Sequence, residues 1–159
     1  LSGARLSNAD LSQSELTGAD LSNTELYNTQ LMGANLSEAN LAGADLQKAQ
    51  LTNTNLHRAN LTSAWLASAQ LQDANLSQAN LFKSTLNSAN LQDADLSQAN
   101  LIEASLIKAN LQDVDLQDAD LNKTILFKAS VSKAALIEAQ LCLTSLPDYT
   151  MHSRDCDRT

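Results

Sequence analysis

The chain places a hydrophobic residue at every fifth position. From Leu1 to Leu146 this register has 30 positions, of which 29 are Leu and one is Val131. A second column, two residues before each following Leu, runs from Ala4 to Thr144 and holds 21 Ala, seven Ser or Thr and one Val. The residue between the two columns is most often Asp or Asn. The repeating unit is therefore Ala-(Asp/Asn)-Leu-x-x.

A five-residue period fits neither a single helix nor a single strand. An α-helix turns about 100° per residue, so Leu at this spacing would step round the helix by roughly 140° and mark no single face. A strand alternates faces, so an odd period would send successive Leu residues to opposite sides. The pattern predicts a solenoid in which every Leu and every small residue points toward one axis.

A longer period gives the number of units in each coil. The segment LQDANLSQAN at 71–80 recurs as LQDADLSQAN at 91–100 and as LQDVDLQDAD at 111–120. The lag from one copy to the next equals four repeat units, which predicts four units per coil. Residues separated by this lag then stack in columns, at the spacing of paired strands, ~4.8 Å.

Residues 1–146 resemble the pentapeptide-repeat family. The resemblance implies an all-β fold, a right-handed quadrilateral β-helix with four pentapeptides per coil and about seven coils. It also implies that Leu and the small residue face inward and the other three positions face outward. Residues 147–159 leave the repeat, and Thr144 or Ser145 followed by Pro147 is typical of a helix start. We expect this tail to form a short C-terminal helical cap.

Charge and composition exclude several function classes. With 18 acidic and 10 basic side chains the net charge is -8, which argues against direct nucleic-acid binding. Apolar stretches are only a few residues long, so no membrane insertion is expected. The sequence has two His, no CxxC motif and no phosphate-binding loop, which predicts neither an enzyme nor a cofactor. His57 is expected to be solvated, and His152 with Cys156 lacks the further ligands of a zinc site.

Two outward features are candidates for function. One is an acidic stripe, which is a solvated face, a weak cation site or a partner surface. The other is a set of outward apolar residues, which predicts a surface for self-association or for docking of another protein. The acidic stripe consists of Asp73, Asp93, Asp95, Asp113 and Asp115, with Asp118 and Asp120 on the neighbouring face; the candidate interface consists of Trp65, Phe82, Ile102, Ile107, Ile125 and Phe127.

The two cysteines, Cys142 and Cys156, leave two alternatives open. A disulfide between them would staple the tail to the rod and imply an exported or lumenal protein, whereas free thiols are usual in the cytoplasm. Resemblance to cyanobacterial and plastid family members, the absence of an initiator Met and the candidate disulfide together favour the periplasm or thylakoid lumen. The cytoplasm is the alternative location.

The function expected is that of a non-enzymatic structural or protein-interaction solenoid. The partner would be another protein or a second copy. The alternative comes from the resemblance: some members of the family mimic duplex DNA and bind a type II topoisomerase such as gyrase. The acidic stripe fits that mechanism.

Overall fold

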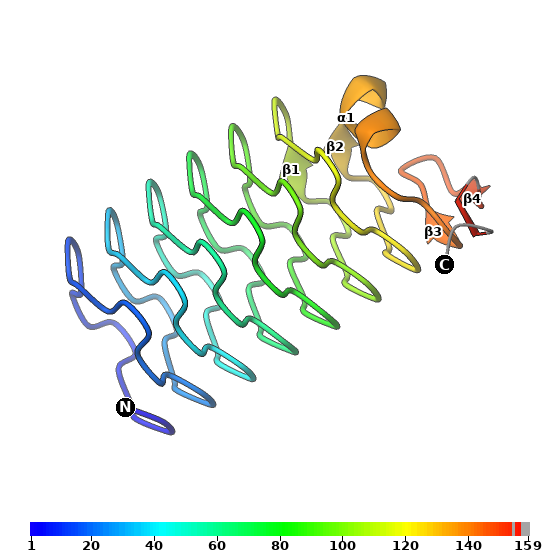
Figure 1. The fold of residues 1–159 in the computed structure, drawn as a ribbon. Helices are drawn as coiled ribbons and strands as arrows, with labels where there is room; N and C mark the ends of the chain where they lie inside the picture. Colours follow the sequence, from blue (N-terminus) through cyan, green and yellow to red (C-terminus); the bar gives the residue numbers. More distant parts are fainter. Residues whose placement is uncertain (154, 157–159) are drawn as a thin grey trace.

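The computed structural model describes residues 1–153 and 155–156, which form an elongated β-helix with the N-terminus at one end and the C-terminal segments at the other (Figure 1). Single-residue parallel bridges join equivalent residues of successive coils, from Arg5 with Glu25 to Ile125 with Ser145. In the regular part a bridge falls on every fifth residue, so each coil has four sides of one pentapeptide each. This agrees with the lag between the similar segments of the sequence.

Tight turns form the corners between the sides. In each regular unit the N–H of the small residue donates to the carbonyl of the Leu three residues earlier, as from Ala64 to Leu61 at 3.0 Å. The residue before the small one has positive φ, which type II turns require at their third position. The four glycines all occupy this position, but most turns place another residue there, such as Ser88 with φ 58°. Hydrogen bonds between stacked coils therefore hold the backbone in this conformation even at residues whose side chains disfavour it.

The Asp or Asn before each Leu has a local structural role. Its side-chain oxygen accepts the N–H of the residue two positions later, as Asp95 does from Ser97 at 2.8 Å. Asn side chains also join neighbouring coils, and the amide of Asn100 donates to the side-chain oxygen of Asn80 at 3.1 Å. Short polar side chains commonly satisfy backbone groups in this way. They account for the Asp and Asn column of the repeat.

The core is a ladder of leucines along the rod axis. Every Leu of the register from Leu21 to Leu126 is at most 1% exposed. The small residues that alternate with them are buried too, because the backbone lies close to the axis there. Leu1 in the first coil is 63% exposed, since only one face of that coil is stacked. Burial of each Leu contributes about 1.5–3 kcal/mol, so the ladder dominates stability.

The regular coil is interrupted by one helix near the C-terminal end. Strand β1 (Asn110–Leu111) pairs in parallel with β2 (Ser130–Val131), and α1 (Lys133–Glu138) follows. The Ser132 hydroxyl accepts the N–H of Ala135 at 3.1 Å and caps α1. The repeat then resumes, with bridges from Gln140 and Ser145 to the preceding coil. Among the described residues, no helix is long and apolar enough to cross a membrane.

The tail differs from the prediction. Strand β3 (Thr144–Ser145) pairs antiparallel with β4 (Met151–His152), so the predicted helix start at Thr144 or Ser145 is wrong. The hydroxyl of Thr144 donates inward to the carbonyl of Leu121 at 2.7 Å and is not available to cap a helix. Within the described part of 147–159 there is a turn and a strand but no α-helix. Residues 154 and 157–159 of the predicted cap lie outside the described residues.

Candidate interaction surface

The four-sided coil places two chemically different surfaces on opposite sides of the rod. Trp65 and Ile125 belong to one bridge column, and Asp95 and Asp115 belong to another that lies half a coil away. We call the first the apolar side and include the turn columns on both of its edges. We call the second the acidic side. It includes the turn column of Asp73, Asp93 and Asp113.

The predicted interface residues all lie on the apolar side, but they do not form one continuous patch. On the bridge column, Trp65 is 57% and Ile125 is 41% exposed, and Thr85 and Ser105 separate them. The remaining four are half-buried in the turns along the edges. Most of the set gathers in the coils of residues 101–140, while Trp65 stands in an earlier coil. The edge residues are Phe82 and Ile102 in successive coils on one edge, and Ile107 and Phe127 in successive coils on the other.

Trp65 borders a shallow depression on this side. A pocket of about 260 Å³ is lined by Gln47, Trp65, Ala67 and Thr85. Trp65 is more than half exposed beside this depression, so a partner group can pack against the indole. Aromatic side chains in such positions are frequent centres of protein interfaces.

The tail adds residues that were not predicted as part of this surface. The ring of Tyr149 lies against that of Phe127, with centroids 4.1 Å apart and planes inclined by 47°. Tyr149 is 71% exposed and extends the apolar side toward the C-terminal end. One signal for this contact was present in the sequence: Pro147 lies one full coil after Phe127 and so continues its column, which places the following residues nearby.

Lysines line both edges of the apolar side. The ammonium groups of Lys83 and Lys128 lie 4.9 and 5.1 Å from the ring centroids of Phe82 and Phe127. Such cation–π contacts contribute about 0.5–1 kcal/mol at exposed sites. In the N-terminal half, Lys48 lies 5.3 Å from the Tyr27 ring centroid, and a hydrogen bond with the Tyr27 side chain raises the pKa of Lys48.

The acidic side contains carboxylates that support turns and others that are exposed to solvent. Asp95 and Asp115 face each other across adjacent coils, and each accepts the N–H of the residue two positions later at 2.8 Å. These two residues therefore support turns as Asn does elsewhere. Asp73, Asp93 and Asp113 are exposed in turns with φ of 55–57°. No group of three or more metal-ligating side chains gathers here or elsewhere among the described residues.

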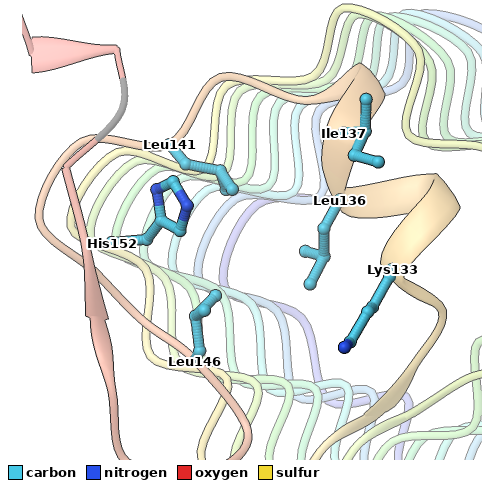
Figure 2. A pocket seen from close by; sticks show the side chains of 6 residues that line it. All are labelled: Lys133, Leu136, Ile137, Leu141, Leu146 and His152. Carbon is cyan, nitrogen blue, oxygen red and sulfur yellow. The ribbon is translucent and has the colours of Figure 1, made fainter.

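A cavity lies at the C-terminal end of the leucine core. Figure 2 shows the side chains of Leu136, Leu141 and Leu146 around a space over the last coil. Its volume is about 290 Å³, and Lys133, Ile137 and His152 complete the lining. The tail borders this space through His152 of β4, and the Asp155 side chain accepts the N–H of Leu141 at 3.0 Å.

A disulfide between Cys142 and Cys156 holds the tail to the last coil. Of the two alternatives that the sequence left open, the structure has the disulfide. The bond also removes Cys156 as a thiolate ligand beside His152. The other histidine, His57, bonds through Nδ1 to the hydroxyl of Ser77 at 2.9 Å, in the next coil.

Stacked four-sided coils around a leucine core define a solenoid repeat protein of the β-helix class. The model of pentapeptide repeats matches the chain in eight copies, and the chain therefore belongs to the pentapeptide-repeat family, whose members form right-handed quadrilateral β-helices. The matched segments are 1–37, 34–69, 59–98, 89–126 and 104–141. Comparison with functionally curated proteins finds no match.

Solved structures similar to the chain include other pentapeptide-repeat proteins. HetL of Nostoc sp. strain PCC 7120, involved in heterocyst differentiation regulation, is 28% identical over 94% of this chain and 92% of its own, with a TM-score of 0.30. A pentapeptide-repeat protein from the Arabidopsis thaliana thylakoid lumen is 29% identical over 74% and 71%, with a TM-score of 0.30. Trypsin-treated QnrB1, a plasmid-mediated fluoroquinolone resistance protein, is 17% identical over 94% and 89%, with a TM-score of 0.57. The QnrB1 likeness supports the fold alone.

Proposed function

We propose that the protein is a non-enzymatic interaction scaffold, a right-handed rod of about seven coils that presents its apolar side to another protein. The observation that carries the proposal is the gathering of all six predicted outward apolar residues on one side of the rod, opposite the acidic side. Single exposed hydrophobic residues are ordinary on protein surfaces, whereas contiguous apolar patches mark association surfaces. The contiguous part of this side is the contact between the rings of Phe127 and Tyr149 near its C-terminal end.

The fold supports recognition without rearrangement. Each side is fixed to the next coil by backbone hydrogen bonds, such as Leu66 N–H to the Thr85 carbonyl at 2.7 Å and Trp65 N–H to the Ala44 carbonyl at 2.9 Å. The backbone of such a surface is held before the partner arrives, which lowers the entropy cost of binding. We assign no catalytic step to the chain.

Photo-crosslinking tests the proposal in cells that produce the protein. A benzophenone amino acid replaces Ile107 on the apolar side or, as a matched control, Gln117, which holds the same turn position toward the acidic side. We expect defined protein adducts from position 107 that are absent from position 117 and are lost when Phe127→Glu is added. Equal adduct patterns from both positions would contradict a role for the apolar side. The adduct mass separates a second copy from another protein.

A second candidate function is DNA mimicry toward a type II topoisomerase, which the acidic side favours. Repulsion among Asp73, Asp93 and Asp113 is tolerated there, and a basic partner surface would relieve it. Inhibition of gyrase supercoiling by micromolar protein, lost when these three residues are replaced by Asn, would support mimicry. Full supercoiling activity at that concentration would remove this candidate.

We also propose an oxidising compartment, the periplasm or thylakoid lumen, as the location of the protein. The Cys142–Cys156 disulfide supports it, since such bonds persist outside the reducing cytoplasm. The test is a thiol count on denatured protein from its native source, alkylated at lysis without reductant. No free thiol and a two-proton mass gain on reduction are expected. Two free thiols would place the protein in the cytoplasm.

A further inference from the structure

We infer that the partner of the apolar side is an acidic protein surface, an inference that rests on the proposed function. The chain as a whole has 18 acidic and 10 basic side chains. In the coils from Leu81 to Lys128, by contrast, the turn positions on the two edges of the apolar side hold four lysines and one glutamate, and no charge lies on the bridge column between them. The charged residues of these edges are Lys83, Lys108, Lys123, Lys128 and Glu103.

Among the described residues, the positive charge of these edges is only partly offset, by Glu103 and by Asp148, which follows Lys128 in its column. Lys83 and Lys123 share one carboxylate, that of Glu103, at 3.6 and 3.5 Å. Within the described residues, neither Lys108 nor Lys128 forms an ion pair. A partner that presents carboxylates toward both edges would therefore pair with charges that the rod leaves unmatched.

The edges and the centre of this side suit a protein interface. Stable interfaces combine an apolar or aromatic centre with a polar rim, and charged rims steer the partner and select it. The exposed side chains of Ile125 and Tyr149 supply the apolar centre, with the Phe127 ring packed against Tyr149, and the lysines supply the rim. A partner that matches this surface therefore carries carboxylates opposite the lysines and an apolar region opposite the centre.

A second copy of the chain fits this surface poorly. Two copies paired through their apolar sides about a two-fold axis bring lysine edges against lysine edges, whether the rods run parallel or antiparallel. The acidic side of another copy offers carboxylates, but its neighbouring turn column is occupied by amides instead of apolar groups. Those amides belong to Gln72, Gln92 and Gln112.

An anionic bilayer fits less well than an acidic protein. The net charge of -8 repels an extended anionic surface, whereas a protein can place its carboxylates only where the lysines lie. Phe82 and Phe127 are half-buried beneath lysine ammonium groups, so their rings are not free to insert between lipids. Vesicle binding is therefore treated as a competing outcome of the test.

The fluorescence of Trp65 provides a direct test on the purified, oxidised protein. Trp65 is the sole tryptophan of the chain and is 57% exposed on the apolar side. The probes are a short peptide of alternating Glu and Leu, the same peptide with Lys in place of Glu, and phosphatidylcholine vesicles with or without phosphatidylglycerol. We expect a saturable blue shift with the Glu-Leu peptide at low salt, which weakens as salt is added, and none with the Lys-Leu peptide.

Charge reversal on one edge gives the decisive comparison. The pair Lys108→Glu and Lys128→Glu should weaken Glu-Leu binding about tenfold or more. Arg58→Glu is the matched control, because Arg58 is exposed on another side, where it bonds to Gln78 at 2.8 Å. This control should change binding less than about twofold, and unchanged melting temperatures would show that all variants fold.

Three results would overturn the inference. They are equal shifts with the Glu-Leu and Lys-Leu peptides, Glu-Leu binding unaffected by the double variant, and a shift with anionic vesicles but not with the acidic peptide. The absence of binding by every probe in isothermal titration calorimetry, which does not depend on a contact with Trp65, would also overturn it. The crosslinking experiment is independent of these probes: adducts from position 107 without charge-dependent peptide binding would retain the scaffold function and reject the acidic partner.

Discussion

The hydroxyl of Thr124 donates a 2.7 Å hydrogen bond to the carbonyl oxygen of Leu101, 23 residues earlier in the chain. Thr54 makes the same bond to Leu31 at 2.7 Å, so the relationship recurs along the rod. It joins one coil to the next from inside the core. Among the described residues, no buried side-chain nitrogen or oxygen lacks a hydrogen-bond partner. The inward column of small residues can therefore accommodate a buried Ser or Thr hydroxyl, because that hydroxyl is hydrogen-bonded.

Replacing Thr124 with Val should lower the free energy of unfolding by about 0.5–1.5 kcal/mol. Val preserves the branched shape but removes the donor, while the Leu101 carbonyl keeps its bond from the Ala104 N–H at 2.9 Å. Denaturant titration measures the change. The reciprocal variant Val114→Thr is the control, because Val114 lies in the column of Thr54 and the new hydroxyl can reach the Leu91 carbonyl. A cost for Val114→Thr as large as that for Thr124→Val would contradict the explanation.

Replacing Ser88 with Gly should stabilise the rod. Ser88 holds φ at 58°, a left-handed conformation that costs a residue with a side chain roughly 1–2 kcal/mol and costs Gly almost nothing. Gly loses about 0.5–1 kcal/mol more backbone entropy on folding. The expected net gain is about 0.5–1 kcal/mol, measured as a higher denaturation midpoint.

Ser97→Gly is the matched control for this prediction. Ser97 also lies in a turn of the same rod, but at the position before the left-handed one, and it is not among the residues with positive φ. Only the entropy cost applies there, so this variant should be destabilised by about 0.5–1 kcal/mol. Equal effects at both positions would show that φ does not decide the outcome.

The sequence predicted the core of the rod because each coil repeats the same steric rule. Leucine at every fifth position and a small residue two before it fit one geometry only, and the buried ladder from Leu21 to Leu126 follows it without exception. The column positions of Trp65 and Ile125 followed from the same arithmetic. Their separation by Thr85 and Ser105 could also have been read from the coil-length lag, but the prediction treated the six apolar residues as one group.

The C-terminal end could not be predicted in the same way. Leu136 keeps the register, yet the run from Lys133 to Glu138 is helical, because a Ser132 cap and two alanines favour a helix where stacking is weaker. The contact between Phe127 and Tyr149 depends on where the tail turns back after Pro147. Both outcomes are decided by local competition near the rod end and not by the repeat.

Removing the disulfide should loosen the tail and leave the middle of the rod unchanged. Cys142 and Cys156 are 14 residues apart. Closing a loop of this size lowers the entropy of the unfolded chain and so raises its free energy by about 3 kcal/mol. In a solenoid each coil contacts only its neighbours, so the loss stays local. After Cys142→Ser and Cys156→Ser, hydrogen exchange should accelerate at the Leu146 amide, which donates to Thr150 at 2.8 Å.

The control for this prediction is the backbone N–H of Asn60 in the middle of the rod, which donates to the Ala39 carbonyl at 2.9 Å. Its exchange rate should be the same with and without the disulfide. Equal acceleration at Leu146 and Asn60 would mean that the bond supports the whole rod, and no acceleration at either would mean that it does not hold the tail.

Acid should destabilise the first coils through Asp10 and Asp20. Hydrogen bonds from the Ser22 hydroxyl at 2.7 Å and the Ser22 N–H at 3.1 Å lower the pKa of Asp20, and the Ser12 N–H at 3.0 Å lowers that of Asp10. A carboxyl whose pKa is lower in the folded state contributes stability that is fully present above the unfolded value, about 3.9. That contribution is lost as the pH falls through the lower folded pKa. The melting temperature should therefore drop as the pH falls below about 5 and through the lowered folded pKa values of these two groups.

The double variant Asp10→Asn and Asp20→Asn isolates this contribution. Asn keeps the side-chain oxygen that accepts the backbone N–H, as Asn60 does from Thr62 at 3.2 Å, so the turns should remain intact near neutral pH. The amide does not titrate, and the melting temperature of the variant should fall less than that of the parent over the same pH range. Equal falls would show that other carboxyl groups account for the acid sensitivity, because the two proteins differ only at these two oxygen acceptors.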